Sequence, residues 1–215
     1  YAALCACGAL TFSESVYLID KRGRYMDEEA GKFPGKMAAI IGLEREILQG
    51  VCDKENSPES PVTIANYNCP GQYEISGSEE AVQKVSEAAK TFGAKRALML
   101  NVSGGFHTCL MDKAAERIYA EVVKYNYQKP HTKIIMNATA DYLKIEALPE
   151  LLRKQLNSSI YFEDSIKRAV NDGITKFIEV GPGTVLSGLV KKIDARAEII
   201  SVNNVSDIER VRLWI

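Results

Sequence analysis

One segment of the chain, residues 36–101, constrains the fold most, because strand and helix signals alternate closely along it. Short apolar and β-branched stretches typical of strands are separated by stretches with apolar residues at helical spacing. In chain order we predict strand 37–43, helix 44–53, strand 62–67, strand 72–76, helix 79–92 and strand 96–100. Cys69-Pro70-Gly71 joins two of these strands with turn residues, since Pro fixes φ and Gly accepts positive φ.

This β-α-β-β-α-β order matches the split βαβ, ferredoxin-like arrangement, so we predict residues 36–101 as a small inserted subdomain. Strands and helices also alternate in residues 1–35 and 102–215, which indicates a larger α/β domain built from both flanks. Ser13 is predicted to cap a helix that carries Arg22 and Arg24 and fades at Asp27. The later signals are helices 111–125, 148–156, 162–171 and 185–193, strands 134–137 and 175–180, and a last strand from Ile199.

The composition narrows the class of protein. A chain of 215 residues that is 46% hydrophobic and 26% charged is ordinary for a globular protein. Its net charge of -1 argues against a nucleic-acid partner, since surfaces that bind nucleic acid are usually strongly basic. No apolar run approaches the ~20 residues that cross a bilayer, so no membrane partner is expected. The five cysteines are odd in number and scattered, which favours reduced, buried thiols in a cytoplasmic protein over disulfides or zinc ligands.

His107 is the first candidate for chemistry. It follows the apolar run 97–100 and the small residues Ser103, Gly104 and Gly105, and a helix signal begins directly after it. An imidazole at a strand end suits a general base, and glycines let backbone approach a ligand. The alternative is a histidine satisfied within the core. A base needs a nucleophile, and the chain contains no Gly-x-Ser-x-Gly turn, which presents the serine in many α/β acyl-transfer enzymes.

Other features of the sequence each have a functional and a purely structural interpretation. Arg22 could lie on a solvated helix face or reach a buried anion. Its neighbour Gly23 costs ~1 kcal/mol inside a helix, which suggests that something approaches closely there. Gly181-Pro182-Gly183 could cradle a phosphate at a helix N-terminus, but it lacks the Lys and Ser/Thr of a P-loop, and a tight turn is the alternative. His131 lies in a polar turn beside Pro130 and is predicted to be at the surface.

Several stretches, taken together, resemble one known family. They are Tyr1-Ala-Ala-Leu4, Arg22-Gly23-Arg-Tyr-Met26, Met37-Ala-Ala-Ile-Ile-Gly42, Asn68-Cys-Pro-Gly-Gln72, Gly93-Ala-Lys-Arg96, Val102-Ser103, Phe106-His107, Leu110-Met111 and Glu179-Val-Gly-Pro-Gly183. In this order they are similar to the malonyl-CoA:acyl-carrier-protein transacylases of fatty-acid synthesis, and to the related acyltransferase domains of polyketide synthases. The resemblance implies a partial α/β-hydrolase-like acyltransferase domain into which the ferredoxin-like subdomain is inserted.

The resemblance also implies a serine–histidine mechanism and a role for four residues. The family's serine lies in a Gly-His-Ser-Leu-Gly-Glu turn immediately before the residues matched by Tyr1–Leu4, so the chain is expected to start just after the nucleophile. His107 would be the base, and Gln155 would offer its backbone carbonyl to orient the imidazole. Arg22 would clamp the malonyl carboxylate. Phe106 would favour malonyl over methylmalonyl by excluding the extra methyl group.

The implied partners are malonyl-CoA, acyl carrier protein and a missing N-terminal segment of the same enzyme. Thioester exchange is nearly balanced, so no metal, nucleotide energy source or redox cofactor is expected. One departure is that the family often has Pro or Ala at the positions of Gly104 and Gly105. The alternative function is a non-catalytic remnant that binds carrier protein or packs within a larger synthase.

Overall fold

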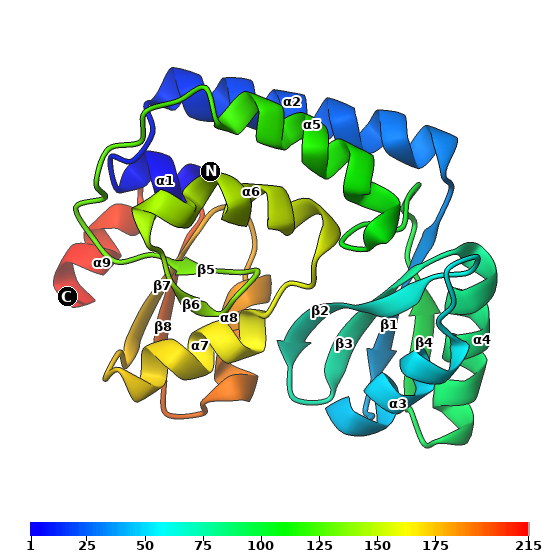
Figure 1. The fold of residues 1–215 in the computed structure, drawn as a ribbon. Helices are drawn as coiled ribbons and strands as arrows, with labels where there is room; N and C mark the ends of the chain where they lie inside the picture. The colour runs from blue at the N-terminus through cyan, green and yellow to red at the C-terminus, as the bar shows by residue number, and fades with distance from the viewer. Residues whose placement is uncertain (215) are drawn as a thin grey trace.

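The computed structural model describes residues 1–214 as a mixture of helices and strands (Figure 1). The elements are α1 (Ala2–Ala6), α2 (Phe12–Lys32), β1 (Lys36–Ile41), α3 (Arg45–Glu55), β2 (Val62–Cys69), β3 (Gln72–Gly77), α4 (Glu79–Thr91), β4 (Arg96–Met99), η1 (Cys109–Met111), α5 (Asp112–Val122), β5 (Ile135–Met136), β6 (Asp141–Tyr142), η2 (Ile145–Ala147), α6 (Leu148–Asn157), α7 (Phe162–Asn171), β7 (Lys176–Val180), α8 (Val185–Ile193), β8 (Glu198–Val202) and α9 (Asp207–Trp214).

Strands β1 to β4 form an antiparallel sheet in the order β2-β3-β1-β4. Helices α3 and α4 lie together against this sheet, as Figure 1 shows. The apolar residues of the strands meet those of the helices in one core, in which Ile40, Ile75 and Val82 are fully buried. This is the ferredoxin-like arrangement predicted from the order of the segments.

A second core lies among the helices α1, α2, α5 and α6. The long helix α2 runs beside α5, and α6 packs against α5 on its other side (Figure 1). Leu18, Ile118 and Leu152, one from each of these three helices, have no exposed surface. The short loop 100–108 crosses from the antiparallel sheet back to this helical layer, and His107 lies in that loop.

The remaining strands form two further pairs. β7 and β8 are parallel, with α7 and α8 beside them, and β5 and β6 form a small antiparallel hairpin. The α/β class predicted from the sequence is confirmed, while the division into two domains stays a prediction. No helix among residues 1–214 is both long and apolar enough to cross a membrane.

Some local predictions were wrong. The cap of α2 is Thr11 rather than Ser13, because Thr11 accepts from the Glu14 amide while the Glu14 carboxylate accepts from the Thr11 amide. The same helix continues through Asp27 to Lys32. The predicted helix 79–92 includes Phe92, yet α4 ends at Thr91 and Phe92, which follows it, is 60% exposed.

Candidate functional site

The loop that carries His107 has a strained backbone. His107 has φ of 61°, in the left-handed region that residues other than glycine rarely adopt. Two contacts hold it there: the His107 amide donates to the Leu156 carbonyl at 3.1 Å, and the Thr108 hydroxyl donates to the Gly105 carbonyl at 2.6 Å. Strain of this kind gathers at functional sites, where the surrounding structure fixes one conformation.

The His107 imidazole is oriented by a backbone carbonyl. Its Nδ1 lies 2.8 Å from the carbonyl oxygen of Gln155, in the last turn of α6. A carbonyl oxygen can only accept a hydrogen bond, so in this contact Nδ1 carries the proton. In the neutral ring Nε2 then has its lone pair free, which is the state that a general base requires.

Burial and a nearby cation keep this ring neutral. Burial, followed by the positive charge of Arg22, lowers the pKa of His107 from 6.5 to about 4, although the bond to Gln155 acts in the opposite direction. The unfolded chain therefore binds a proton between these two values while the folded protein does not. By linkage, the contribution of neutral His107 to the free energy of unfolding is fully present above pH 6.5, and it is lost as the pH falls toward 4.

We expect the His107 ring to titrate with a midpoint near pH 4, and not near 6.5. The measurement is the Cε1–H chemical shift followed by NMR as the pH is lowered. A His131→Gln variant assigns the two histidine signals, because His131 is exposed, as predicted, and away from the Gln155 contact. A midpoint at 6.5 for His107 would show that burial and Arg22 do not act on it.

Arg22 differs from its neighbour Arg24. Arg24 is exposed and pairs with Asp20 at 2.9 Å, one turn earlier in α2. Arg22 is half-buried and, within residues 1–214, forms no ion pair. Burial lowers the pKa of its guanidinium. A half-buried cation without a carboxylate partner is suited to an anionic ligand.

The glycine beside Arg22 has no close neighbour. A Cβ added at Gly23 would meet no atom within 4 Å among the described residues, so the close approach expected there is not found in this part of the chain. The expectation rested on the cost of glycine in a helix, and the helix is formed despite it because its other face is buried against α5.

His107 also borders a cavity of about 340 Å³. Its lining residues come from the segments 53–63, 107–109 and 157–161, and they include Cys109, Ser158 and Ser159 but neither Arg22 nor Phe106. Cys109 is exposed, which corrects the prediction that the cysteines are buried, while all five are free thiols. No motif marked the 157–161 segment as part of a site, because only the fold brings it to His107.

Phe106 and the two glycines before it have a packing role. Phe106 is half-buried against the helical core, and a Cβ on Gly104 would lie 3.0 Å from its ring. Gly105 lies against Leu110 and the Gly77 carbonyl, and Gly104 forms a β-bridge with Pro34. The glycines were expected to let backbone approach a ligand, but within residues 1–214 they let two backbone segments approach each other. How Phe106 affects the choice of acyl group stays a prediction.

Gly105→Ala is expected to destabilise the fold. The added methyl group would lie 2.6 Å from Leu110 Cδ1 and 2.9 Å from the Gly77 oxygen, and only the leucine can move. Overpacking of this kind typically costs about 1–3 kcal/mol. Urea unfolding measures the loss, and Gly31→Ala is the control, because a Cβ added at Gly31 meets nothing within 4 Å and its φ is not in the left-handed region. Equal stability of Gly105→Ala and wild type would contradict the tight packing.

Gly181-Pro182-Gly183 forms a turn whose helix terminus is already occupied. The Glu179 carboxylate accepts from the amides of Leu186 and Ser187 at 3.0 and 2.9 Å, at the start of α8. Burial acts to raise the pKa of Glu179, but the bonds from the Ser187 hydroxyl and from the two amides outweigh it, so the pKa is lowered. The Glu179 carboxylate therefore occupies the helix N-terminus at which a phosphate was considered. Of the two interpretations of Gly181-Pro182-Gly183, the structure supports the tight turn.

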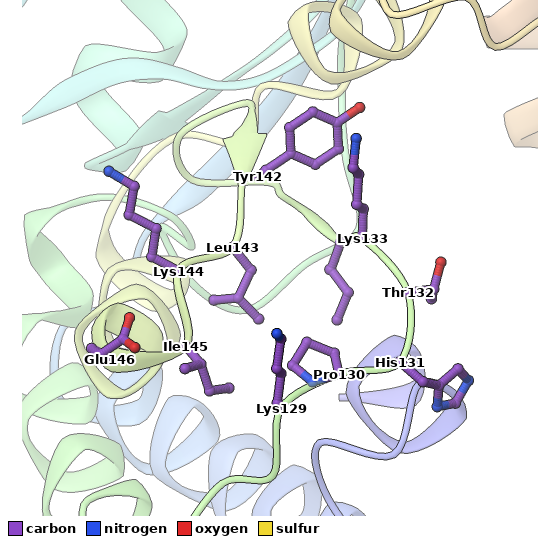
Figure 2. A pocket seen from close by; sticks show the side chains of 11 residues that line it. Lys129, Pro130, His131, Thr132, Lys133, Tyr142, Leu143, Lys144, Ile145 and Glu146 are labelled. Carbon is purple, nitrogen blue, oxygen red and sulfur yellow. The ribbon is translucent and has the colours of Figure 1, made fainter.

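A second cavity lies elsewhere, between the β5–β6 hairpin and the 129–134 loop. It measures about 570 Å³ and is open to solvent. Lys129, Lys133 and Lys144 line it together with His131, as Figure 2 shows. None of the four predicted site residues borders it, so it is separate from the His107 contact.

The α/β fold, a carbonyl-oriented imidazole and a guanidinium that forms no ion pair within residues 1–214 are together suited to acyl transfer. Residues 1–212 match the acyl transferase domain family, and the chain belongs to that family. It is 44% identical over 210 residues to the malonyl CoA-acyl carrier protein transacylase of Bacillus subtilis (strain 168). The aligned residues make up 97% of this chain and 66% of that protein. The chain thus spans slightly less than two thirds of that relative.

Solved structures of transacylases have the same fold as this chain. The malonyl CoA-acyl carrier protein transacylase of Coxiella burnetii superposes with a TM-score of 0.93 at 36% identity, covering 98% of this chain and 67% of that one. A malonyl-transacylase solved with its type II polyketide synthase acyl-carrier protein superposes with a TM-score of 0.91 at 31% identity, covering 96% of this chain and 67% of that one.

Proposed function

We propose that this chain is part of an enzyme that transfers a malonyl group from malonyl-CoA to the thiol of acyl carrier protein. The reaction would run by a ping-pong mechanism through a serine ester, with His107 as the base. The names of the transacylase relatives and of the complex with a carrier protein support this reaction. The five free thiols fit a protein of the reducing cytoplasm.

The observation that carries the proposal is the contact between His107 Nδ1 and the Gln155 carbonyl. It fixes the tautomer in which Nε2 can take a proton from a serine hydroxyl. The serine oxygen would then attack the malonyl thioester, and CoA would leave as the imidazolium returns the proton to its sulfur. In the second half of the cycle the carrier thiol would lose its proton to Nε2 and take the malonyl group.

Arg22 gives the proposal its acyl specificity. The free carboxylate of malonyl needs a cation once it is removed from water, and a guanidinium binds a carboxylate through two parallel hydrogen bonds. The positive charge of Arg22 contributes to the lowered pKa of His107, which supports the proposal that the clamp and the base serve the same site. An acetyl group has no such carboxylate and would gain nothing from Arg22.

The nucleophile is proposed to lie outside the 215 residues, because none of their serines stands in a Gly-x-Ser-x-Gly turn. We expect the purified 215-residue chain to form no malonyl ester when incubated with malonyl-CoA, whereas the full-length protein gains one malonyl group. Intact-mass spectrometry measures both. A stoichiometric ester on a serine of residues 1–215 would overturn this assignment, and a full-length protein that takes up no malonyl would favour the non-catalytic, carrier-binding alternative.

A further inference from the structure

The segment from Gln155 to Tyr161 connects His107 to the antiparallel sheet. At one end, the carbonyls of Gln155 and Leu156 accept from the Nδ1 and the amide of His107, at 2.8 and 3.1 Å. At the other end, Ile160 bonds to strand β2, with its amide 2.7 Å from the Ala65 carbonyl. The position of the orienting carbonyl therefore depends on how this segment is held.

Asn137 bonds to both ends of the segment. Its side-chain oxygen accepts from the Gln155 amide nitrogen Nε2 at 2.7 Å. Its backbone carbonyl accepts from the Tyr161 amide at 2.8 Å. No other residue among 1–214 is bonded both to Gln155 and to Tyr161, so Asn137 spans the segment whose first carbonyl orients the imidazole.

Asn137 is itself fixed by the hairpin in which it lies. It directly follows β5, which pairs with β6, and the amides of Thr139 and Ala140 donate to the Met136 carbonyl at 3.2 and 2.8 Å. Met136 is almost fully buried in the helical core. A residue on such a turn can hold its hydrogen-bond partners in place, because its own backbone and side chain are held by the turn and by these bonds.

We propose that Asn137 is a positioning residue that holds the Gln155 carbonyl against His107. It acts through Gln155 and touches no reacting atom. The proposal rests on the proposed function of His107 as the base, and it predicts that losing the Asn137 oxygen weakens proton transfer while substrate binding is kept.

The test compares two substitutions in the full-length protein. Asn137→Leu has nearly the same size but removes the oxygen that Gln155 uses, and Asn137→Asp keeps an acceptor oxygen at the same place. We expect Asn137→Leu to lower kcat by about 10- to 100-fold with little change in KM, since a small misplacement of a catalytic group can cost about two decades. Asn137→Asp should recover most of kcat.

A second variant acts from the other side of the same bond. Gln155→Met removes the Nε2 donor but keeps the backbone carbonyl, so it should lower kcat as Asn137→Leu does. The double variant should be no slower than either single one, because both remove the same interaction. Gln155→Met also carries the test if Asn137→Leu does not fold. Thr139→Val is the matched control, since among residues 1–214 its hydroxyl is hydrogen-bonded only to the Asp141 amide in the same turn.

A readout independent of activity separates this proposal from the proposed function. The ring nitrogen NMR shifts of His107 report which nitrogen carries the proton, and Asn137→Leu should make these shifts approach the average of the two tautomers. A wild-type protein that transfers no malonyl would refute the proposed function, while the NMR shifts would still test Asn137. Unchanged shifts and kcat in Asn137→Leu, additive losses in the double variant, or an equal loss in Thr139→Val would overturn the proposal.

Discussion

His107→Ala is expected to abolish most malonyl transfer in the full-length protein. In the proposed mechanism the imidazole takes the proton from the attacking serine and from the carrier thiol, and general-base help is worth about 100- to 10,000-fold. The measurement is kcat/KM for malonyl-CoA with carrier protein as the acceptor. The loss should appear in kcat, because the variant keeps Arg22, which is proposed to bind the malonyl carboxylate.

The strained backbone at His107 requires a second variant. Alanine at φ of 61° could disturb the loop, whereas asparagine is more readily accommodated in the left-handed region. We therefore expect His107→Asn to be as inactive as His107→Ala while it unfolds at nearly the urea concentration of wild type. His131→Ala is the control for a histidine at the surface. Near-normal turnover in His107→Asn would show that the imidazole is only structural.

Arg22→Ala is expected to change which acyl group the enzyme prefers. A charge-assisted pair between a guanidinium and a carboxylate is worth roughly 1.5–3 kcal/mol, or one to two decades in specificity. The variant should therefore lower malonyl transfer and leave acetyl transfer unchanged or improved. Arg22→Lys should already reduce malonyl transfer, since an ammonium cannot form the two parallel bonds. The measurement is the ratio of kcat/KM for malonyl-CoA to that for acetyl-CoA.

Arg24→Ala is the matched control for Arg22. Arg24 is in the same helix, but it is exposed and pairs with Asp20, so its loss should leave the ratio unchanged. The pKa of His107 gives a second comparison: it should rise in Arg22→Ala, because the charge of Arg22 lowers it in wild type, and stay the same in Arg24→Ala. A ratio that follows Arg24 instead of Arg22 would mean that the clamp is assigned to the wrong residue.

Much of the architecture could be read from the sequence because it depends on local signals. The predicted helix 162–171 and helix 185–193 coincide with α7 and α8, and the order of strands and helices in 36–101 is the one observed. Apolar periodicity and turn residues specify such elements within a short stretch of chain. The sequence located their ends less well: the cap of α2 was placed at Ser13 instead of Thr11, since both are hydroxyl residues near the start of the helix and either can cap it.

The site depended on contacts between residues far apart in the chain. His107, Arg22 and Gln155 were named from the sequence, the last two roles through family resemblance, and the fold brings the Gln155 carbonyl within 2.8 Å of the imidazole. Asn137 had no sequence signal, because its partners are 18 and 24 positions away and only the packing of the β5–β6 hairpin on α6 brings them together.

The sequence by itself determined the elements, the α/β class and the residue types that can do chemistry, because local propensity and periodicity encode these. Only the tertiary structure decided which polar groups meet. It assigned the α8 terminus to Glu179 instead of a phosphate and placed Gly105 against the Gly77 carbonyl. It also left Arg22 without an ion pair within residues 1–214 while Arg24 has one. Hydrogen bonds and burial depend on the distance between atoms in space, which the order of residues along the chain does not state.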